Sequence, residues 1–364
     1  MPDSPIVVCL GYPDLLEPEY TLRVEAIDSR FQVVGLPVDP DGEWLTVPPA
    51  EPHPEPPPWA RSVEADRKRA LAKCEILISL HTPRNLPALA PQLRWIQGMG
   101  AGVEQFARAG VTSERVRLTN ASGLASASMA EFVIGRLLAF WKRFPEQAEL
   151  QKRHEYTQTY GRTFSGSTVG IVGFGSIGRE VAKRARALGC RVVGVRRSHE
   201  PGQTSPHADI LYGVDGLHEL LEQSDAVIVS APATEETRHL ISAKELACMQ
   251  RGTILVNVAR GSLLDEAALT RSLMDGHLGG AALDVFEQEP LPPDSPLWDL
   301  PNVLLSAHSS VSTDRYVDDA FELFLDNLGR YASAQPLRNQ VDMDALGFAP
   351  QDPAGKAEET GEDH

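Results

Sequence analysis

The sequence is poor in cysteine, in positive charge and in long apolar runs, and each scarcity excludes a class of protein. Its four cysteines lie far apart, which argues against a zinc site or a disulfide framework. No stretch approaches the roughly 18 unbroken apolar residues of a membrane span, and no basic segment followed by an apolar run of signal-peptide length opens the chain. We therefore expect no metal, no membrane association and a cytoplasmic location.

The scarcity of positive charge bears on the partners of the protein. The chain carries 34 Lys and Arg residues against 50 Asp and Glu residues, a formal net charge of -16. This balance argues against nucleic acid as the main partner. It does not exclude a small anionic substrate, because a local cluster of cations can dominate a small site.

Short apolar runs alternate with amphipathic stretches along the 364 residues, which predicts an α/β protein with mainly parallel sheets and room for two domains. Seven prolines between Pro48 and Pro58 predict an extended surface loop over residues 39–60, with a proline-recognition ligand as the alternative. Strands are predicted near residues 6–10, 31–38, 75–80, 93–97, 167–172, 191–195, 225–230, 253–258, 281–285 and 302–306, and helices near 62–73, 125–144, 177–188, 243–249, 265–275 and 313–332.

A glycine-rich turn follows the strand predicted at 167–172. Gly173, Gly175 and Gly178 form a G-x-G-x-x-G pattern between that strand and a predicted helix. Gly173 permits a tight turn, Gly175 lets the backbone approach a pyrophosphate, and Gly178 lets the helix pack closely on the strand. Free N–H groups at the helix N-terminus favour phosphate binding. This context predicts a dinucleotide site, against the alternative of a glycine turn without a ligand.

The residues after the next strand indicate which dinucleotide is bound. A site that prefers NAD usually places Asp or Glu about 20 residues past the glycine motif, whereas this chain has Arg196, Arg197 and Ser198 there. Two guanidinium groups and a hydroxyl suit the 2′-phosphate of NADP better than a free ribose diol. We predict NADP as the preferred cofactor. NAD is the alternative, in which case the two arginines are merely solvated.

Three side chains with catalytic chemistry each stand beyond the end of a predicted strand: Arg260, Glu289 and His308. Ligands of open α/β sheets bind at the carboxyl ends of the strands. The three residues therefore predict a single site. Taken singly, each has a structural alternative, as a salt-bridge arginine, a surface acid or a structural histidine.

With these motifs in order, the chain resembles the D-isomer-specific 2-hydroxyacid dehydrogenase family, which includes glyoxylate/hydroxypyruvate reductases and D-3-phosphoglycerate dehydrogenases. Family members usually carry proline directly before the catalytic histidine, whereas this chain has Ala307, and the missing proline predicts a looser histidine loop. The resemblance covers residues 75–341 and rests on Gly100–Glu104, the glycine turn, Thr234–Arg238, Val256–Asp265, Asp284–Pro290, Ser295–Val303 and the order Arg260, Glu289, His308.

The resemblance assigns roles to the three residues. In the reduction of a 2-oxo acid, a hydride moves from the nicotinamide to the carbonyl carbon, and His308 supplies the proton that the oxygen gains. Glu289 is expected to bond the far ring nitrogen of His308 and to favour its imidazolium form. Arg260 is expected to bind the substrate carboxylate and to polarise the carbonyl.

The resemblance also implies contacts with substrate and cofactor. The expected substrate contacts are Gly100, Ala101 and Gly102, whose backbone N–H groups would hold the carboxylate, together with Arg260 and His308; the alternative for the glycine loop is a plain strand-ending turn. Asp284 is expected to face the nicotinamide carboxamide. The expected cofactor contacts are Gly173, Gly175, Ser176, Ile177, Gly178, Arg196, Arg197, Ser198, Ala231, Pro232, Ala259 and Asp284.

The fold that follows is two doubly wound α/β domains with parallel sheets: a Rossmann-type cofactor domain and a flavodoxin-like substrate domain, with the site in the cleft between them. We expect the dinucleotide-binding domain at residues 120–311 and a discontinuous substrate domain at 1–119 and 312–343. Residues 344–364, rich in Pro, Gly, Glu and Asp, are expected to be a disordered tail. Family members are commonly dimers, so a homodimer is expected, with the helix at 125–144 and its continuation at the interface.

The leading prediction is an NADP-preferring reductase of glyoxylate, hydroxypyruvate or a similar small 2-oxo acid. An alternative is a corepressor-like protein that senses a dinucleotide and recruits a partner without turnover, since fold alone does not decide function. Formate or phosphite oxidation on the same scaffold is a third possibility. Formate chemistry is disfavoured, because the related formate enzymes carry Gln where Glu289 stands.

Overall fold

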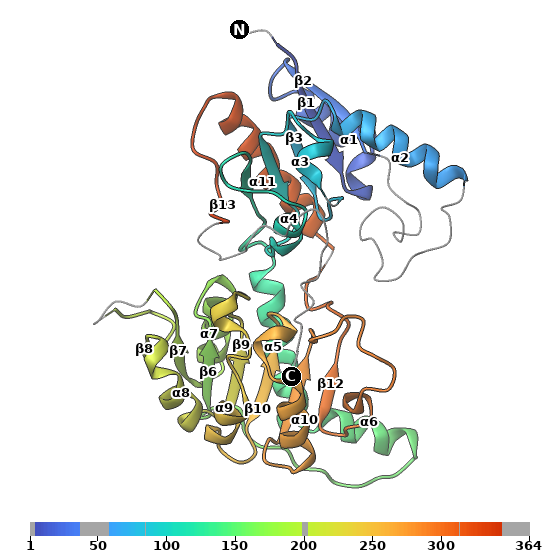
Figure 1. Ribbon diagram of the computed structural model, residues 1–364. Coiled ribbons are helices and arrows are strands. Elements are labelled where there is room, and N and C mark those ends of the chain that lie inside the picture. Colours follow the sequence, from blue (N-terminus) through green and yellow to red (C-terminus); the bar gives the residue numbers. More distant parts are fainter. Residues whose placement is uncertain (1–3, 37–57, 84, 199–202, 313, 344–364) are drawn as a thin grey trace, which may run out of the picture. The chain divides into compact units, whose positions relative to one another are not determined.

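The computed structural model describes residues 4–36, 58–83, 85–198, 203–312 and 314–343 (Figure 1). The chain divides into two compact units. Unit 1 comprises residues 1–124 and 314–364, and unit 2 comprises residues 125–313. The predicted tail at 344–364 lies outside the described residues.

Unit 1 contains a six-stranded sheet with the order β13-β5-β4-β3-β1-β2. Its strands β1 to β5 run parallel, and β13 pairs antiparallel with β5. The order 2-1-3-4-5 of the parallel strands is the flavodoxin-like arrangement, which confirms the predicted fold class. The strands are β1 (Ile6–Gly11), β2 (Phe31–Gly35), β3 (Ile76–Ser79), β4 (Trp95–Gly98), β5 (Arg117–Thr119) and β13 (Gln340–Val341).

Helices of unit 1 cover both faces of its sheet. Successive side chains of a strand point to opposite faces, so neighbouring residues of one strand pack against different helices. Val8 packs in a core with residues of α1 and α11, whereas its neighbour Cys9 packs in a second core with residues of α2, α3 and α4. Strands buried on both faces are nearly continuous apolar runs, as the first three residues of β3 are. The helices are α1 (Pro18–Glu25), α2 (Pro58–Leu71), α3 (Leu86–Leu89), α4 (Glu104–Arg108) and α11 (Tyr316–Ala332).

Unit 2 contains a seven-stranded parallel sheet with the order β12-β11-β10-β9-β6-β7-β8. Counted within the unit, this is the Rossmann order 3-2-1-4-5-6 with one further strand at the edge beyond it. The topological switch point lies between β6 and β9. The strands are β6 (Thr168–Val172), β7 (Arg191–Val195), β8 (Ile210–Tyr212), β9 (Ala226–Val229), β10 (Ile254–Asn257), β11 (Gly280–Leu283) and β12 (Val303–Leu305).

Helices also cover both faces of the second sheet. Residues of α5 and α7 form one core with it, and residues of α8, α9 and α10 form the other. A doubly wound sheet of this kind places its loops, and with them its ligands, at the carboxyl ends of the strands. The helices are α5 (Ser126–Trp141), α6 (Phe144–Lys152), α7 (Ser176–Ala187), α8 (Leu217–Gln223), α9 (Ala243–Cys248) and α10 (Glu266–Met274).

Two element predictions were wrong. The helix predicted at 125–144 ends at Trp141, because Arg143 adopts a left-handed φ of 60°, and Pro145 lies in the first turn of α6, where its missing N–H is not needed. The predicted loop at 39–60 ends too late, because α2 begins at Pro58; residues 39–57 lie outside the described residues. Several short elements were not predicted because they are too short to show a clear periodicity: α1, α3, α4, α6, α8, β5, β8 and β13.

Within the described ranges, no helix is long and apolar enough to cross a membrane. The same residues contain no group of three or more His, Cys, Asp and Glu side chains that could hold a metal ion.

Candidate active site

The glycine turn lies between β6 and α7, and two of its glycines are required by packing. Gly173 has a φ of 98°, and a Cβ there would lie 2.3 Å from the backbone nitrogen of Ala231. A Cβ on Gly178 would lie 2.5 Å from the carbonyl oxygen of Gly173. Gly175 differs, because a Cβ there would meet nothing within 4 Å among the described residues beyond its chain neighbours.

The open position at Gly175 directly precedes the N-terminus of α7. Ser176 and Ile177 are the first residues of that helix, so their N–H groups have no acceptor within it. Open space beside free N–H groups at the positive end of a helix fits a pyrophosphate. The turn therefore has the shape and the electrostatics that a dinucleotide requires.

Arg196, Arg197 and Ser198 follow β7, the strand next to β6 in the sheet. The guanidinium of Arg197 lies 3.7 Å from the carboxylate of Glu236, and the two side chains are 62% and 78% exposed. Exposed ion pairs contribute little to stability, so Glu236 is readily exchanged for another anion. Nη2 of Arg196 donates to the carbonyl of Ser198 at 3.1 Å. These residues form a cationic site that a 2′-phosphate would fit.

His308 and Glu289 are in direct contact. Nδ1 of His308 lies 2.9 Å from Oε2 of Glu289, and the other carboxylate oxygen accepts from the N–H of Phe286 at 3.1 Å. The side chains of His308 and Glu289 are 50% and 37% exposed, so the imidazole is accessible. A carboxylate on Nδ1 orients the ring and leaves Nε2 to exchange a proton with a reactant.

The loop that carries His308 is held by Asp284. His308 has a φ of 49°, and its N–H donates to the carbonyl of Asp284 at 2.8 Å. The carboxylate of Asp284 accepts from the N–H groups of Ser309 at 2.8 Å and Ser310 at 3.1 Å, and from the hydroxyl of Ser306 at 2.7 Å. The loop that lacks proline before the histidine is thus restrained by one carboxylate.

The ionisation of Asp284 follows from these bonds. Asp284 is only 1% exposed, and burial alone would raise the pKa of its carboxyl group. Hydrogen bonds from the hydroxyls of Ser310 and Ser306 and from the two backbone N–H groups outweigh the burial and lower that pKa below its usual value. The carboxylate is therefore ionised at neutral pH and acts as a fixed acceptor for the histidine loop.

Arg260 lies on a separate loop, between β10 and the short 3-10 helix η4 (Gly261–Leu263). Buried Asn257 braces this loop: its Nδ2 donates to the carbonyl of Arg260 at 2.9 Å, and its Oδ1 accepts from the N–H of Ala259 at 3.0 Å. Nη1 of Arg260 donates to the carbonyl of Ala259 at 2.7 Å. A Cβ on Gly261 would lie 1.8 Å from the carbonyl carbon of Phe286, so glycine lets this loop touch the loop of Glu289.

The other predicted cofactor contacts follow β9. The backbone of Ala231 packs on Gly173, and the carbonyl of Pro232 accepts from the hydroxyl of Thr237 at 2.8 Å. Gly100, Ala101 and Gly102 belong to unit 1, in the loop between β4 and α4.

The structure thus brings His308 and Glu289 together and places the Arg260 loop against the Glu289 loop. Asn257 was not among the predicted site residues, although an Asn at a strand end three residues before the arginine is a visible signal. Ser306 and Ser310 were not among them either. Serines give no periodic signal, and their role depends on Asp284, which follows a different strand, β11.

Comparison with known proteins agrees with this geometry. Residues 134–310 match the NAD binding domain of the D-isomer specific 2-hydroxyacid dehydrogenases. A glyoxylate reductase of Korarchaeum cryptofilum is 32% identical over 291 residues, which cover 76% of this chain and 85% of that protein. A D-3-phosphoglycerate dehydrogenase of Methanocaldococcus jannaschii is 33% identical over 275 residues, 75% of this chain and 51% of that protein, so the matched part of this chain spans about half of that relative's length.

A solved structure of a related reductase has a similar fold. The NADPH-dependent glyoxylate/hydroxypyruvate reductase of Sinorhizobium meliloti, in complex with NADP and sulfate, superposes with a TM-score of 0.74 at 27% identity, over 94% of this chain and 99% of that one.

The sheet order, the glycine turn and the His–Glu pair define an NAD(P)-dependent oxidoreductase with a Rossmann-type cofactor fold. Within that class, the chain belongs to the D-isomer specific 2-hydroxyacid dehydrogenase family. The prediction of the family, of the enzyme class and of a nicotinamide dinucleotide cofactor is confirmed. The alternative of a dinucleotide sensor without turnover finds no support in these relatives.

Proposed function

We propose that this chain is an NADP-preferring reductase of glyoxylate, hydroxypyruvate or a similar small 2-oxo acid. The observation that carries the proposal is the 2.9 Å contact between His308 and Glu289 at the strand ends of unit 2. Two of the three relatives named above support the substrate class, because one is a glyoxylate reductase and another a glyoxylate/hydroxypyruvate reductase by name; the third is a D-3-phosphoglycerate dehydrogenase.

The roles of the residues follow from elementary chemistry. The dinucleotide, when bound, supplies the hydride. His308 gives the proton from Nε2 to the developing alkoxide, while Glu289 on Nδ1 stabilises the imidazolium before that transfer. Arg260 holds the substrate carboxylate through its fork of donors. Gly100, Ala101 and Gly102 offer backbone N–H groups to the same carboxylate.

The cofactor is assigned to residues 120–311 and the substrate loops to residues 1–119 and 312–343. Gly173, Gly175 and Gly178 would hold the pyrophosphate, with Arg196 and Arg197 at the 2′-phosphate, which is the reason for preferring NADP. Asp284 serves the nicotinamide end of the site by fixing the histidine loop.

A homodimer in the cytoplasm completes the proposal. Apolar and aromatic side chains support a second copy: Phe144 on α6 is 52% exposed, and Tyr156 and Tyr160 after it are 102% and 78% exposed. Light scattering on the purified protein should give the mass of two chains, and the mass of one chain would contradict the dimer.

The direct test is the oxidation of NADPH and NADH by purified protein with a panel of 2-oxo acids, from glyoxylate and hydroxypyruvate to phenylpyruvate and branched-chain acids. We expect turnover with small acids and a higher kcat/KM with NADPH. A kcat/KM tenfold higher with NADH would contradict the cofactor preference. Clear dinucleotide binding without turnover of any acid would contradict the reductase itself.

A further inference from the structure

The loop after β4 in unit 1 has an unusual arrangement of its peptide groups. Each carbonyl from Met99 to Gly102 accepts a hydrogen bond from elsewhere in unit 1. Among the described residues, the N–H groups of Gly100, Ala101 and Gly102 donate none. With the carbonyls engaged, consecutive N–H groups remain for an outside acceptor, which is the form of a backbone anion site.

Side chains distant in the sequence hold two of these carbonyls at short distances. The hydroxyl of Tyr316 donates to the carbonyl of Met99 at 2.6 Å. Nδ2 of Asn120 donates to the carbonyl of Ala101 at 2.7 Å. The other two carbonyls accept a backbone bond and a longer local bond. The N–H of Ala121 donates to the carbonyl of Gly100 at 2.9 Å, and Nε2 of Gln105 donates to the carbonyl of Gly102 at 3.4 Å.

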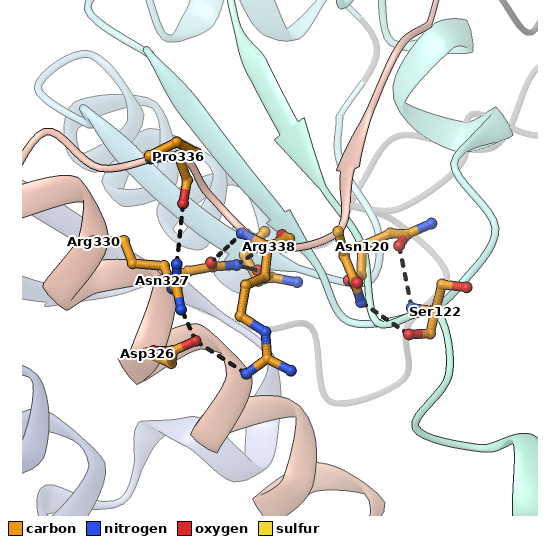
Figure 2. A network of polar contacts seen from close by, with 9 residues as sticks. Asn120, Ser122, Asp326, Asn327, Arg330, Pro336 and Arg338 are labelled. Atoms are coloured by element: carbon orange, nitrogen blue, oxygen red, sulfur yellow. Dashed lines mark hydrogen bonds and ion pairs between the residues drawn. The ribbon is translucent and has the colours of Figure 1, made fainter.

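Asn120 is itself fixed by the C-terminal part of unit 1 (Figure 2). Its Oδ1 accepts from the N–H of Ser122 at 3.1 Å, and its carbonyl accepts from Nδ2 of Asn339 at 3.2 Å. The preceding residue, Arg338, bonds through its N–H to Asn327 of α11 at 2.8 Å. Helix α11 therefore reaches the loop twice, through this network and directly through Tyr316.

Tyr316 is suited to be a permanent donor. It is the first residue of α11, so the axis of that helix fixes its position. Burial, and to a smaller extent the neighbouring Tyr12, raise the pKa of Tyr316 to about 12. The phenol therefore keeps its proton throughout the physiological range, and the carbonyl of Met99 is its acceptor.

We propose that Tyr316 is a positioning residue for the substrate carboxylate: its hydrogen bond to Met99 turns the first peptide of the loop inward, so that the N–H groups of Gly100–Gly102 face the substrate. The proposal rests on the proposed function, since it assigns the carboxylate of a 2-oxo acid to this loop. It adds a residue from α11 whose side chain does not itself touch the substrate.

The test is Tyr316→Phe, compared with Tyr331→Phe. Tyr331 lies on the same helix, and its hydroxyl donates to Glu75 at 2.8 Å, away from the loop. The loss of one such bond should weaken carboxylate binding about threefold to tenfold in Tyr316→Phe. We expect KM for glyoxylate to rise by that factor, with KM for NADPH and kcat within about twofold of wild type. The melting temperature should fall by a similar amount in Tyr316→Phe and in Tyr331→Phe. Tyr331→Phe should leave both KM values unchanged.

A second readout does not depend on turnover. Oxamate is a carboxylate that mimics a 2-oxo acid and accepts no hydride, so its dissociation constant can be measured by calorimetry on the NADPH-loaded protein. It should weaken by the same factor in Tyr316→Phe and remain unchanged in Tyr331→Phe. Unchanged oxamate binding in Tyr316→Phe, equal weakening in both variants, or no oxamate binding by wild type would each overturn the positioning role. Wild-type protein that binds oxamate but reduces no 2-oxo acid would contradict only the proposed function.

Discussion

The two units hold the loops that we assign to cofactor and substrate by different physical means. In unit 2, the glycine turn is fixed by backbone packed on backbone: Gly173 and Gly178 leave no room for a Cβ. In unit 1, the loop Gly100–Gly102 is fixed by side-chain hydrogen bonds from Tyr316 and Asn120. The first loop is thus encoded locally, whereas the second depends on residues that the fold brings from a distance. Substitutions should therefore act differently on the two loops.

Gly173→Ala should have the largest effect on stability, because it combines a φ of 98° with a contact of 2.3 Å to the backbone of Ala231. We expect the free energy of unfolding to fall by about 2–5 kcal/mol, measured by urea denaturation, with loss of NADPH binding. Gly175→Ala is the matched control. Its Cβ would meet nothing within 4 Å in the part of the chain that the structure describes, so stability should be retained while the binding of NADPH weakens. Equal destabilisation by the two variants would contradict the division between a packed and an open glycine.

Asp284→Asn should have the next largest effect, because an amide offers one acceptor oxygen where the carboxylate offers two. The variant leaves a buried donor of the His308 loop poorly satisfied, which should cost about 1–3 kcal/mol of stability. It should also lower kcat, because the loop that orients His308 loosens. Asp209→Asn is the control, since Asp209 accepts from the N–H of Val192 at 2.8 Å elsewhere in unit 2. If both variants lose stability and neither loses kcat, Asp284 does not position the histidine.

The same carboxylate gives a pH dependence. The pKa of Asp284 is lowered in the folded protein, so the stability it adds is complete above the ordinary aspartate pKa of about 3.9 and is lost as the pH falls through the folded value. The difference in unfolding free energy between wild type and Asp284→Asn should be constant near neutrality and shrink below about pH 4. A difference that grows on acidification would contradict the assigned direction.

Gly100→Ala should have the smallest effect. A Cβ at Gly100 would make an ordinary contact of 3.4 Å with Leu80, and the loop is held by bonds that this change leaves intact. We expect the free energy of unfolding to change by less than about 0.5 kcal/mol. A loss as large as that of Gly173→Ala would show that both loops depend on glycine packing, and the comparison between the units would fail.

The same contrast between local and distant interactions explains which elements and site residues could be predicted from the sequence. Strand β7 was predicted at its observed bounds, Arg191–Val195, and the glycine turn at its observed place, because both signals are local. The end of α5 was misplaced, because Pro145 was read as a stop, whereas it lies in the first turn of α6. Tyr316 could not be assigned, since its partner Met99 lies far away in the chain. Asp284 was expected at the cofactor, but its bonds to Ser306, Ser309 and Ser310 appear only when two strand ends are adjacent.

The most direct test of the central claim is the rate of NADPH oxidation with glyoxylate or hydroxypyruvate by wild-type protein and by His308→Ala. If His308 is the proton donor held by Glu289, kcat should fall by about 10²–10⁴-fold, while the dissociation constant of NADPH stays unchanged. A variant that retains wild-type kcat would contradict the assignment, and the proton would have to come from another group.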